Sequence, residues 1–272
     1  MNEKQTLTDP RKIARNIKQS NEYLAQGEKP SSMATLRKKI AKVAFKFAGH
    51  DSENNFANLE QMSTRLFGSL AHFIDNQMAL DDLRVRREQA STMSQRKKLT
   101  DDMEPYKRGV IGLNRSISDI FDANRDISNS DIQNFAHQAW MLMHKPEEVQ
   151  YGITKLKQAL RGMDHETAME AAFWNIPGVD NVRQTTEQDE LMGIDRIIEF
   201  DDGEILNIDI KSSRRGAEDV IYRPGHGLPL ASQFSDDEIF LHRPTDEALA
   251  ARQPYINQTI ADLKKRYGER AA

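Results

Sequence analysis

The chain has 272 residues, enough for one large domain or two smaller ones with their own cores. It contains no cysteine, which excludes a thiolate nucleophile, a cysteine-based zinc site and disulfide bonds, so any metal must take oxygen or histidine ligands. The net charge of -4 conceals an asymmetry: residues 1–50 have 11 Lys or Arg and 4 Asp or Glu, a balance of +7, and residues 51–272 therefore balance at -11.

The basic first fifty residues suit a polyanionic partner such as nucleic acid or an anionic membrane. An equally good interpretation is the solvated face of a helix, because basic and apolar residues alternate there at helical spacing. The basic positions are Arg37, Lys38, Lys39, Lys42 and Lys46, and the apolar positions are Leu36, Ile40, Val43 and Phe47.

The first twenty residues are polar and lack the apolar core of a secretory signal, and no run of eighteen uncharged apolar residues occurs in the sequence. We therefore expect a cytoplasmic protein without a transmembrane segment. Export by a machinery that reads other signals is left open.

The first half of the chain shows helical patterning and no convincing strand. An amphipathic helix is predicted over residues 33–48. A second helix begins near Phe56. From there a mostly apolar series of residues recurs at steps of three and four as far as Leu80, which is the spacing of a helix packed on another helix. The polar run from Arg87 to Pro105 interrupts this pattern, and we interpret it as a frayed helix end or a loop closed by the proline.

Two further helices are predicted over residues 110–123 and 130–144, the second stopped by Lys145-Pro146. His137 and His144 lie seven residues apart on one face of it. We interpret both as core residues, together with the neighbouring tryptophan and methionines, and not as metal ligands. These helices offer a surface for a protein partner or for a homo-oligomer.

Strand patterns appear in the second half, after one more helix that ends before Pro177. Strands are predicted over residues 179–186, 193–200, 204–212 and 237–243. A last helix follows, kinked or restarted at Pro254. The expected fold class is α+β, with a helical domain over residues 1–148 and a mixed domain over residues 149–272.

The charged residues of the two central strands include Asp195 on one and Asp209 and Lys211 on the next. Side chains alternate between the two faces of a strand, so Asp209 and Lys211 share a face. Carboxylates are ligands that Mg²⁺ prefers, and a lysine beside them is suited to stabilise phosphate charge or to help activate a metal-bound water. Phosphodiester hydrolysis is the reaction that this set fits best.

The turn between these strands decides whether the two carboxylates meet. A two-residue turn, Asp202-Gly203, would turn Asp195 away from Asp209. A three-residue loop ending in a left-handed glycine would pair Phe200 with Glu204, and Asp195 would then face Asp209. Such neighbours have Cβ atoms about 4.5 to 5.5 Å apart, close enough for both carboxylates to bind one divalent ion.

The order Gly193-Ile194-Asp195, a turn, then Asp209-Ile210-Lys211 resembles the PD-(D/E)XK nuclease superfamily, over roughly residues 150–245. Ile194 stands where the proline of the motif would be. The resemblance implies a restriction-endonuclease-like αβββ(α)β core followed by a C-terminal helix. It also implies Asp195 and Asp209 as ligands of Mg²⁺ or Mn²⁺, and Lys211 as a catalytic residue.

The resemblance further implies an acidic residue on the helix before the sheet. Glu166 and Glu170 are the candidates, and we favour Glu166 as the third metal ligand because it shares a face with Met169 and Phe173, which should pack on the sheet.

The superfamily also has a helix between the acid-x-lysine strand and the next one, whereas residues 212–235 contain several glycines and prolines and no clean helical period. We interpret them as a degraded crossover or an irregular loop that contacts substrate. The candidate phosphate contacts there are Ser212, Arg214, Arg215 and Arg223, and ordinary solvated loop charges are the alternative for the arginines.

The leading hypothesis is a Mg²⁺- or Mn²⁺-dependent nuclease, endonuclease or exonuclease, with DNA expected over RNA as its substrate. One alternative is a nuclease-like module that has lost catalysis and binds nucleic acid or protein. Another is a helical interaction protein that works through the basic N-terminus and the seam from Phe56 to Leu80.

Overall fold

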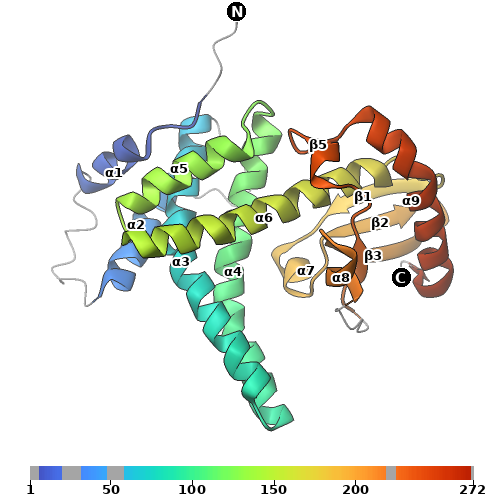
Figure 1. Cartoon of the computed structure of the whole chain (residues 1–272), viewed down its shortest axis with the longest axis horizontal. Coiled ribbons are helices and arrows are strands. Elements are labelled where there is room, and N and C mark those ends of the chain that lie inside the picture. The colour runs from blue at the N-terminus through green and yellow to red at the C-terminus, as the bar shows by residue number, and fades with distance from the viewer. Residues whose placement is uncertain (1–5, 20–31, 48–57, 219–224, 271–272) are drawn as a thin grey trace, which may run out of the picture. The chain divides into compact units, whose positions relative to one another are not determined.

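The computed structural model describes residues 6–19, 32–47, 58–218 and 225–270. The chain divides into two compact units, Met1–Gln158 and Ala159–Ala272. This division lies inside helix α6 (Pro146–Phe173), about ten residues after the boundary expected from the sequence. Figure 1 shows the helices and strands of both units. No helix in the described residues is long and apolar enough to cross a membrane.

The described part of the first unit is helical. Its helices are α1 (Pro10–Gln19), α2 (Met33–Phe47), α3 (Leu59–Gln89), α4 (Met93–Ala123), α5 (Asn129–Met141) and the start of α6. Helix α5 begins at the N-cap Ser128, whose hydroxyl accepts a hydrogen bond from the Asp131 amide. Phe56, where the seam was expected to begin, lies outside the described residues.

The interpretation of residues 87–105 as a frayed end or loop was wrong. Only Ala90, Ser91 and Thr92 separate α3 from α4, and α4 runs through Pro105. Thr92 and Gln95 form a capping box that starts α4. Because Met103 packs between the two helices, tertiary contacts hold a helix that local composition disfavours.

Trp140 lies at the centre of the first unit. Its indole Nε1 donates to the Leu70 carbonyl at 2.9 Å, and its ring stacks on Phe73 with centroids 5.9 Å apart. The expected core role of the histidines is only partly right. His137 is exposed, and the buried His144 side chain lies after the end of α5, so the two do not share one helix face.

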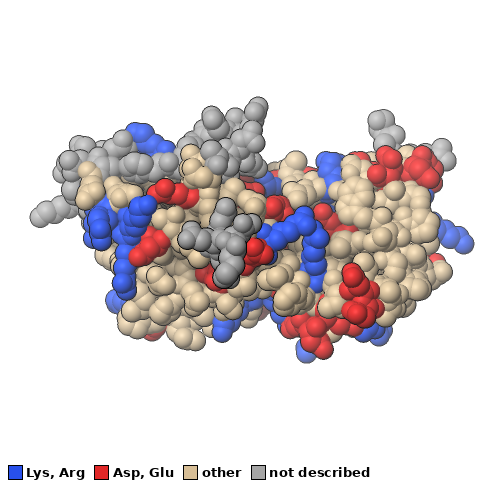
Figure 2. All heavy atoms as spheres, turned by 90° about the horizontal axis from the view of Figure 1, so that it is seen from above, with Lys and Arg blue, Asp and Glu red and all other residues tan. Residues whose placement is uncertain are grey.

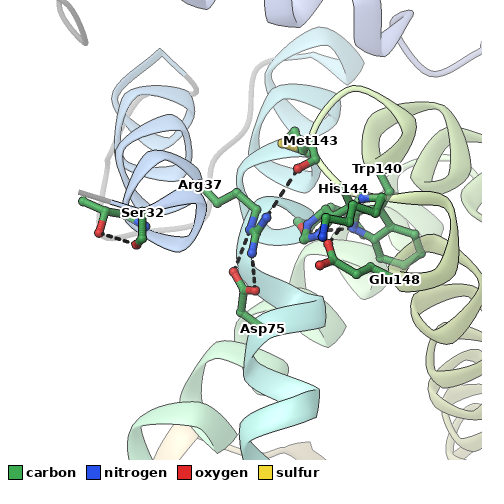
Figure 3. A network of polar contacts seen from close by, with 10 residues as sticks. Ser32, Arg37, Asp75, Trp140, Met143, His144 and Glu148 are labelled. Atoms are coloured by element: carbon green, nitrogen blue, oxygen red, sulfur yellow. Dashed lines mark hydrogen bonds and ion pairs between the residues drawn. The ribbon is translucent and has the colours of Figure 1, made fainter. Parts of the chain in front are cut away.

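Arg37 is buried, which corrects its assignment to a solvated helix face. Figure 3 shows its guanidinium on Asp75, with Nε to Oδ2 at 2.8 Å and Nη2 to Oδ1 at 2.5 Å, and Nη1 directed at the Met143 carbonyl at 3.4 Å. In the same region, His144 Nδ1 lies 2.9 Å from Glu148 Oε2. The bidentate ion pair joins α2 to α3.

The second unit contains a mixed sheet. Strands β1 (Val179–Gln184), β2 (Arg196–Phe200), β3 (Glu204–Lys211) and β4 (Leu228–Ala231) follow one another in space, and β7 (Glu269–Arg270) also pairs with β3. The β1–β2 and β2–β3 pairs are antiparallel, whereas β4 is parallel to β3. The remaining elements are α7 (Glu187–Leu191), α8 (Arg214–Glu218), the 3-10 helix Asp236–Glu238, β5 (Ile239–Phe240), β6 (Arg243–Pro244) and α9 (Asp246–Tyr267).

The prediction of a strand over residues 237–243 was wrong. This segment forms the separate two-stranded pair β5–β6, which turns at Leu241 and His242 with positive φ angles of 45° and 66°. The fourth strand of the sheet is β4, whose residues were expected to belong to a degraded crossover or an irregular loop. Helix α9 runs without interruption through Pro254.

One apolar cluster joins α6, the sheet and α9. Met169 and Phe173 of α6 belong to it with Ile208 of β3 and with Ile256 and Ile260 of α9, and all five are at most 1 % exposed. Burial of each such side chain stabilises the fold by roughly 1.5–3 kcal/mol, which fixes the position of α6 relative to β3.

Candidate functional site

The loop between β2 and β3 has three residues, Asp201–Gly203. The ladder pairs Arg196 with Ile208 and continues to Glu199 opposite Ile205, a register that sets Phe200 opposite Glu204. Gly203 has φ 81°, and its amide donates to the Phe200 carbonyl at 2.9 Å. Of the two turns considered, the chain therefore adopts the one that brings Asp195 to the side of Asp209.

Asp195 lies just before the regular part of β2. Its amide donates to the Ile208 carbonyl at 2.8 Å, and its carboxylate Oδ2 accepts a hydrogen bond from the Ile210 amide at 2.7 Å. The side chain thus takes a backbone donor of β3 and lies at the carboxyl end of that strand, where Asp209 and Lys211 also stand.

Asp209 is a buried carboxylate, with a side chain that is 7 % exposed. It forms an ion pair with the ammonium group of Lys211, which is 33 % exposed. The buried Oδ1 has this ionic contact but no hydrogen bond of regular geometry within the described residues. The ionised form of this buried carboxylate is therefore stabilised by the nearby positive charge of Lys211.

Two glycines allow the loops before β2 and β4 to close on Asp209. A Cβ atom on Gly227 would lie 2.2 Å from the Gly193 carbonyl oxygen and 2.8 Å from the Asp209 Cβ. Gly193 has φ 70°, a left-handed conformation that glycine adopts without strain. His226 Nδ1 lies 2.8 Å from the Met192 carbonyl oxygen and joins the same two loops.

The two acids of α6 have different partners. Glu170 Oε2 accepts from Arg196 Nε at 2.6 Å, whereas Glu166 Oε2 lies 3.7 Å from Arg196 Nη1. Arg196 also donates to the Asp195 carbonyl at 2.6 Å. Glu170 is therefore taken up by a strong ion pair, and Glu166 is held more loosely beside it.

The carboxylates at this end of β3 act on one another. The pKa of Glu166 is raised to about 7, mainly by burial and also by the negative charges of Glu190 and Asp209, against the opposing charges of Arg196 and Lys211. Burial raises the pKa of Asp195 well above its usual value, and the charges of Glu166 and Asp209 add to the rise. Glu166, Asp195 and Asp209 thus form one electrostatic cluster.

Sequence reasoning missed the residues that support this cluster. Arg196 has the clearest signal, because it lies two residues before the buried Ile198 and therefore shares its strand face. His165 is buried, with Nδ1 2.9 Å from Ser232 Oγ and Nε2 2.9 Å from Asp236 Oδ1. The Ser232 amide donates to the Lys211 carbonyl at 2.7 Å, so His165 connects α6 to the end of β3.

Arg214 and Arg215, two of the candidate phosphate contacts, are more exposed than the three acids of the electrostatic cluster. Arg214 is 88 % exposed and pairs with Glu218 within α8 at 2.8 Å, and Arg215 is also exposed. Ser212 is half-buried and directly follows β3, two residues before α8 begins. Arg223 lies outside the described residues.

The donor set suits a hard cation, although it is not a preformed cage. Carboxylate oxygens are ligands that Mg²⁺ prefers. The negative charges of Glu166 and Asp209 add to the burial that raises the pKa of Asp195, and a divalent ion would offset this repulsion. No group of three or more Asp, Glu or His side chains in the described part of the chain has the geometry of a metal site.

No family model, curated protein or solved structure matches this chain. Any function assigned to it therefore rests on the chemistry of its own residues.

Proposed function

We propose that the second unit is a Mg²⁺- or Mn²⁺-dependent nuclease that hydrolyses phosphodiester bonds, with DNA as the expected substrate. The observation that carries the proposal is the convergence of Asp195, Asp209 and Lys211 at the carboxyl end of β3, with Glu166 coupled to the two aspartates by charge. Two carboxylates with a lysine beside them suit metal-assisted attack of water on a phosphodiester.

The order of elements also supports the proposal. Helix α6, the antiparallel strands β1, β2 and β3, the short helix α8 and the parallel strand β4 follow the αβββ(α)β order that the resemblance to PD-(D/E)XK nucleases implies. In this arrangement Gly193 and Gly227, in the loops before β2 and β4, lie beside Asp209.

The proposed roles follow from charge and position. Asp195, Asp209 and Glu166 would hold the metal ion, which when bound supplies Lewis-acid activation of water and phosphate. Lys211 would exchange its contact with Asp209 for a non-bridging phosphate oxygen, where its charge stabilises the pentacoordinate transition state. The water oxygen forms the new bond to phosphorus as the water releases a proton to solvent, and the bond from phosphorus to the leaving sugar oxygen breaks as that oxygen takes a proton from solvent.

The test is cleavage of single- and double-stranded DNA and RNA by the purified chain with Mg²⁺, Mn²⁺ or chelator. Asp209→Asn and Lys211→Gln are each expected to reduce the metal-dependent rate at least about 100-fold. Asp180→Asn is the matched control, because Asp180 is exposed on β1 and should leave the rate unchanged. Metal-dependent cleavage that persists unchanged in both site variants would overturn the assignment.

A second candidate function is a nucleic-acid-binding module without catalysis. The observation that favours it is that Lys211 already neutralises Asp209 and the Ile210 amide already occupies one oxygen of Asp195. Binding of nucleic acid without cleavage under any of the metal conditions would select this candidate.

A further inference from the structure

The turn between α3 and α4 concentrates positive charge. We define the hairpin tip as residues 84–98, which contain six Lys or Arg and one Glu, a balance of +5 in a chain whose net charge is -4. All six basic side chains are exposed. They are Arg84, Arg86, Arg87, Arg96, Lys97 and Lys98.

The two helices that carry the tip pack on each other there. The small apolar cluster beneath it consists of Leu80, Leu83 and Met103 with Leu99, Tyr106 and Val110 around them, all from α3 and α4. Figure 1 shows the two helices side by side as far as their joint end. The pairing holds the basic residues of both helices near one another and leaves their outer faces to solvent.

Acidic residues neutralise the tip only in part. Arg84 pairs with Asp81 at 3.2 Å, and Asp81 also pairs with Lys155 at 2.7 Å. Arg86 pairs with Asp82 at 3.5 Å through exposed side chains, an interaction that contributes little.

Among the described residues, four cations of the tip have no ion pair: Arg87, Arg96, Lys97 and Lys98. Of these, Arg96 donates a hydrogen bond to the Ala90 carbonyl. The effect of the charges reaches Lys107, whose pKa is lowered first by burial and then by Arg84 and Arg87. An excess of positive charge therefore remains at the tip.

We propose that the hairpin tip binds the sugar-phosphate backbone of nucleic acid. The excess of positive charge at the tip does not depend on the nuclease proposal. The choice of nucleic acid as the polyanion rests on the proposed nuclease function. Phosphates at regular spacing suit cations presented on two adjacent helices, and such contacts hold a strand without reading its sequence. This surface differs from the basic first fifty residues, to which charge counting had pointed.

An anionic membrane fits the tip less well. Helices that lie on membranes bury a continuous apolar face, whereas the large exposed apolar residues of the tip are Val85 and Met93, one on each helix. On the face drawn in Figure 2, Lys and Arg side chains occur among Asp and Glu side chains.

The test is fluorescence anisotropy of a labelled 30-nucleotide DNA, single-stranded or duplex, titrated with the full chain in chelator at several salt concentrations. The tip variant Arg87→Gln/Lys97→Gln/Lys98→Gln is expected to weaken binding at least 10-fold at low salt and to lower the salt slope by about two to three. Its matched control is Arg11→Gln/Arg15→Gln/Lys18→Gln on α1, which removes the same charge from exposed positions. Circular dichroism should show equal helix content in all three proteins.

Three results would overturn the proposal. The first is an unchanged DNA affinity and salt slope in the tip variant, and the second is an equal loss of DNA affinity in the α1 variant. The third is that the tip cations are needed for binding to phosphatidylserine vesicles but not to DNA. Cleavage by the unmodified chain separates this proposal from the nuclease assignment. If the unmodified chain binds DNA through the tip cations but does not cleave it with Mg²⁺ or Mn²⁺, the nuclease function fails and the binding surface stands.

Discussion

Asp195 and Ile210 are joined by a side-chain to backbone hydrogen bond of 2.7 Å, in which the Asp195 carboxylate accepts the Ile210 amide. The bond keeps Asp195 at the end of β3 although the regular β2 ladder stops at Arg196. It also keeps a buried carboxylate close to Asp209, where the two charges repel. Local geometry thus favours Asp195 at this place, while electrostatics opposes its ionised form.

Two substitutions of Asp195 should separate these effects. Asp195→Asn keeps an acceptor for the Ile210 amide and removes the repelled charge, so we expect a higher melting temperature at pH 8 together with loss of metal-dependent cleavage. Asp195→Ala leaves the amide unsatisfied and should lower the free energy of unfolding by about 1–3 kcal/mol. Thermal unfolding of both variants checks this, and a lower melting temperature for Asp195→Asn would contradict it.

Glu166 should make stability depend on pH. Its pKa of about 7 lies above the usual 4.5, so the folded state binds more protons between these values, and stability should fall as pH rises from about 4.5 through 7. In Glu166→Gln the fall in the urea midpoint between pH 5 and pH 8 should be smaller than in the unmodified chain. Glu88→Gln, at an exposed position of α3, is the control and should retain the full fall.

Magnesium should oppose this effect of Glu166. If the carboxylates bind the ion, added Mg²⁺ should raise the urea midpoint more at pH 8 than at pH 5, because ionised Glu166 is a ligand and protonated Glu166 is not. An equal shift at both pH values would indicate binding elsewhere.

His144 should make the first unit sensitive to mild acid. The pKa of His144 is lowered below 6.5, and burial is the largest cause of this shift. The unfolded state therefore binds more protons, and the stabilisation present above pH 6.5 is lost as pH falls below it. His144→Gln should reduce the drop in melting temperature between pH 7.5 and pH 5. His137→Gln, on an exposed side chain, should not, and equal curves for both variants would contradict the assignment.

Gly227 should tolerate no side chain. In Gly227→Ala the new Cβ meets the Gly193 carbonyl and the Asp209 backbone, which should lower the free energy of unfolding by about 1–3 kcal/mol and impair the site. Gly162→Ala is the control, because a Cβ there meets no neighbouring atom and alanine favours the helix by about 0.5–1 kcal/mol. Denaturant unfolding of the two variants should therefore move in opposite directions.

The sequence by itself determined the helical first half, the α+β class and strands β1, β2 and β3. Hydrophobic periodicity carries this information, because it distinguishes helix from strand without reference to tertiary contacts. It also indicated the set of Asp195, Asp209 and Lys211, because alternation along a strand fixes which side chains share a face.

Only the tertiary structure decided the remaining features. Packing of α3 on α4 carries helix through Pro105, and pairing with β3 makes a strand of β4, which contains Pro229 and has only four residues. Pairing with Asp75 buries Arg37. The turn length, and with it the meeting of Asp195 and Asp209, was one of two local possibilities until the β2–β3 register was known. Each of these outcomes depends on contacts between segments distant in the sequence, which no local pattern contains.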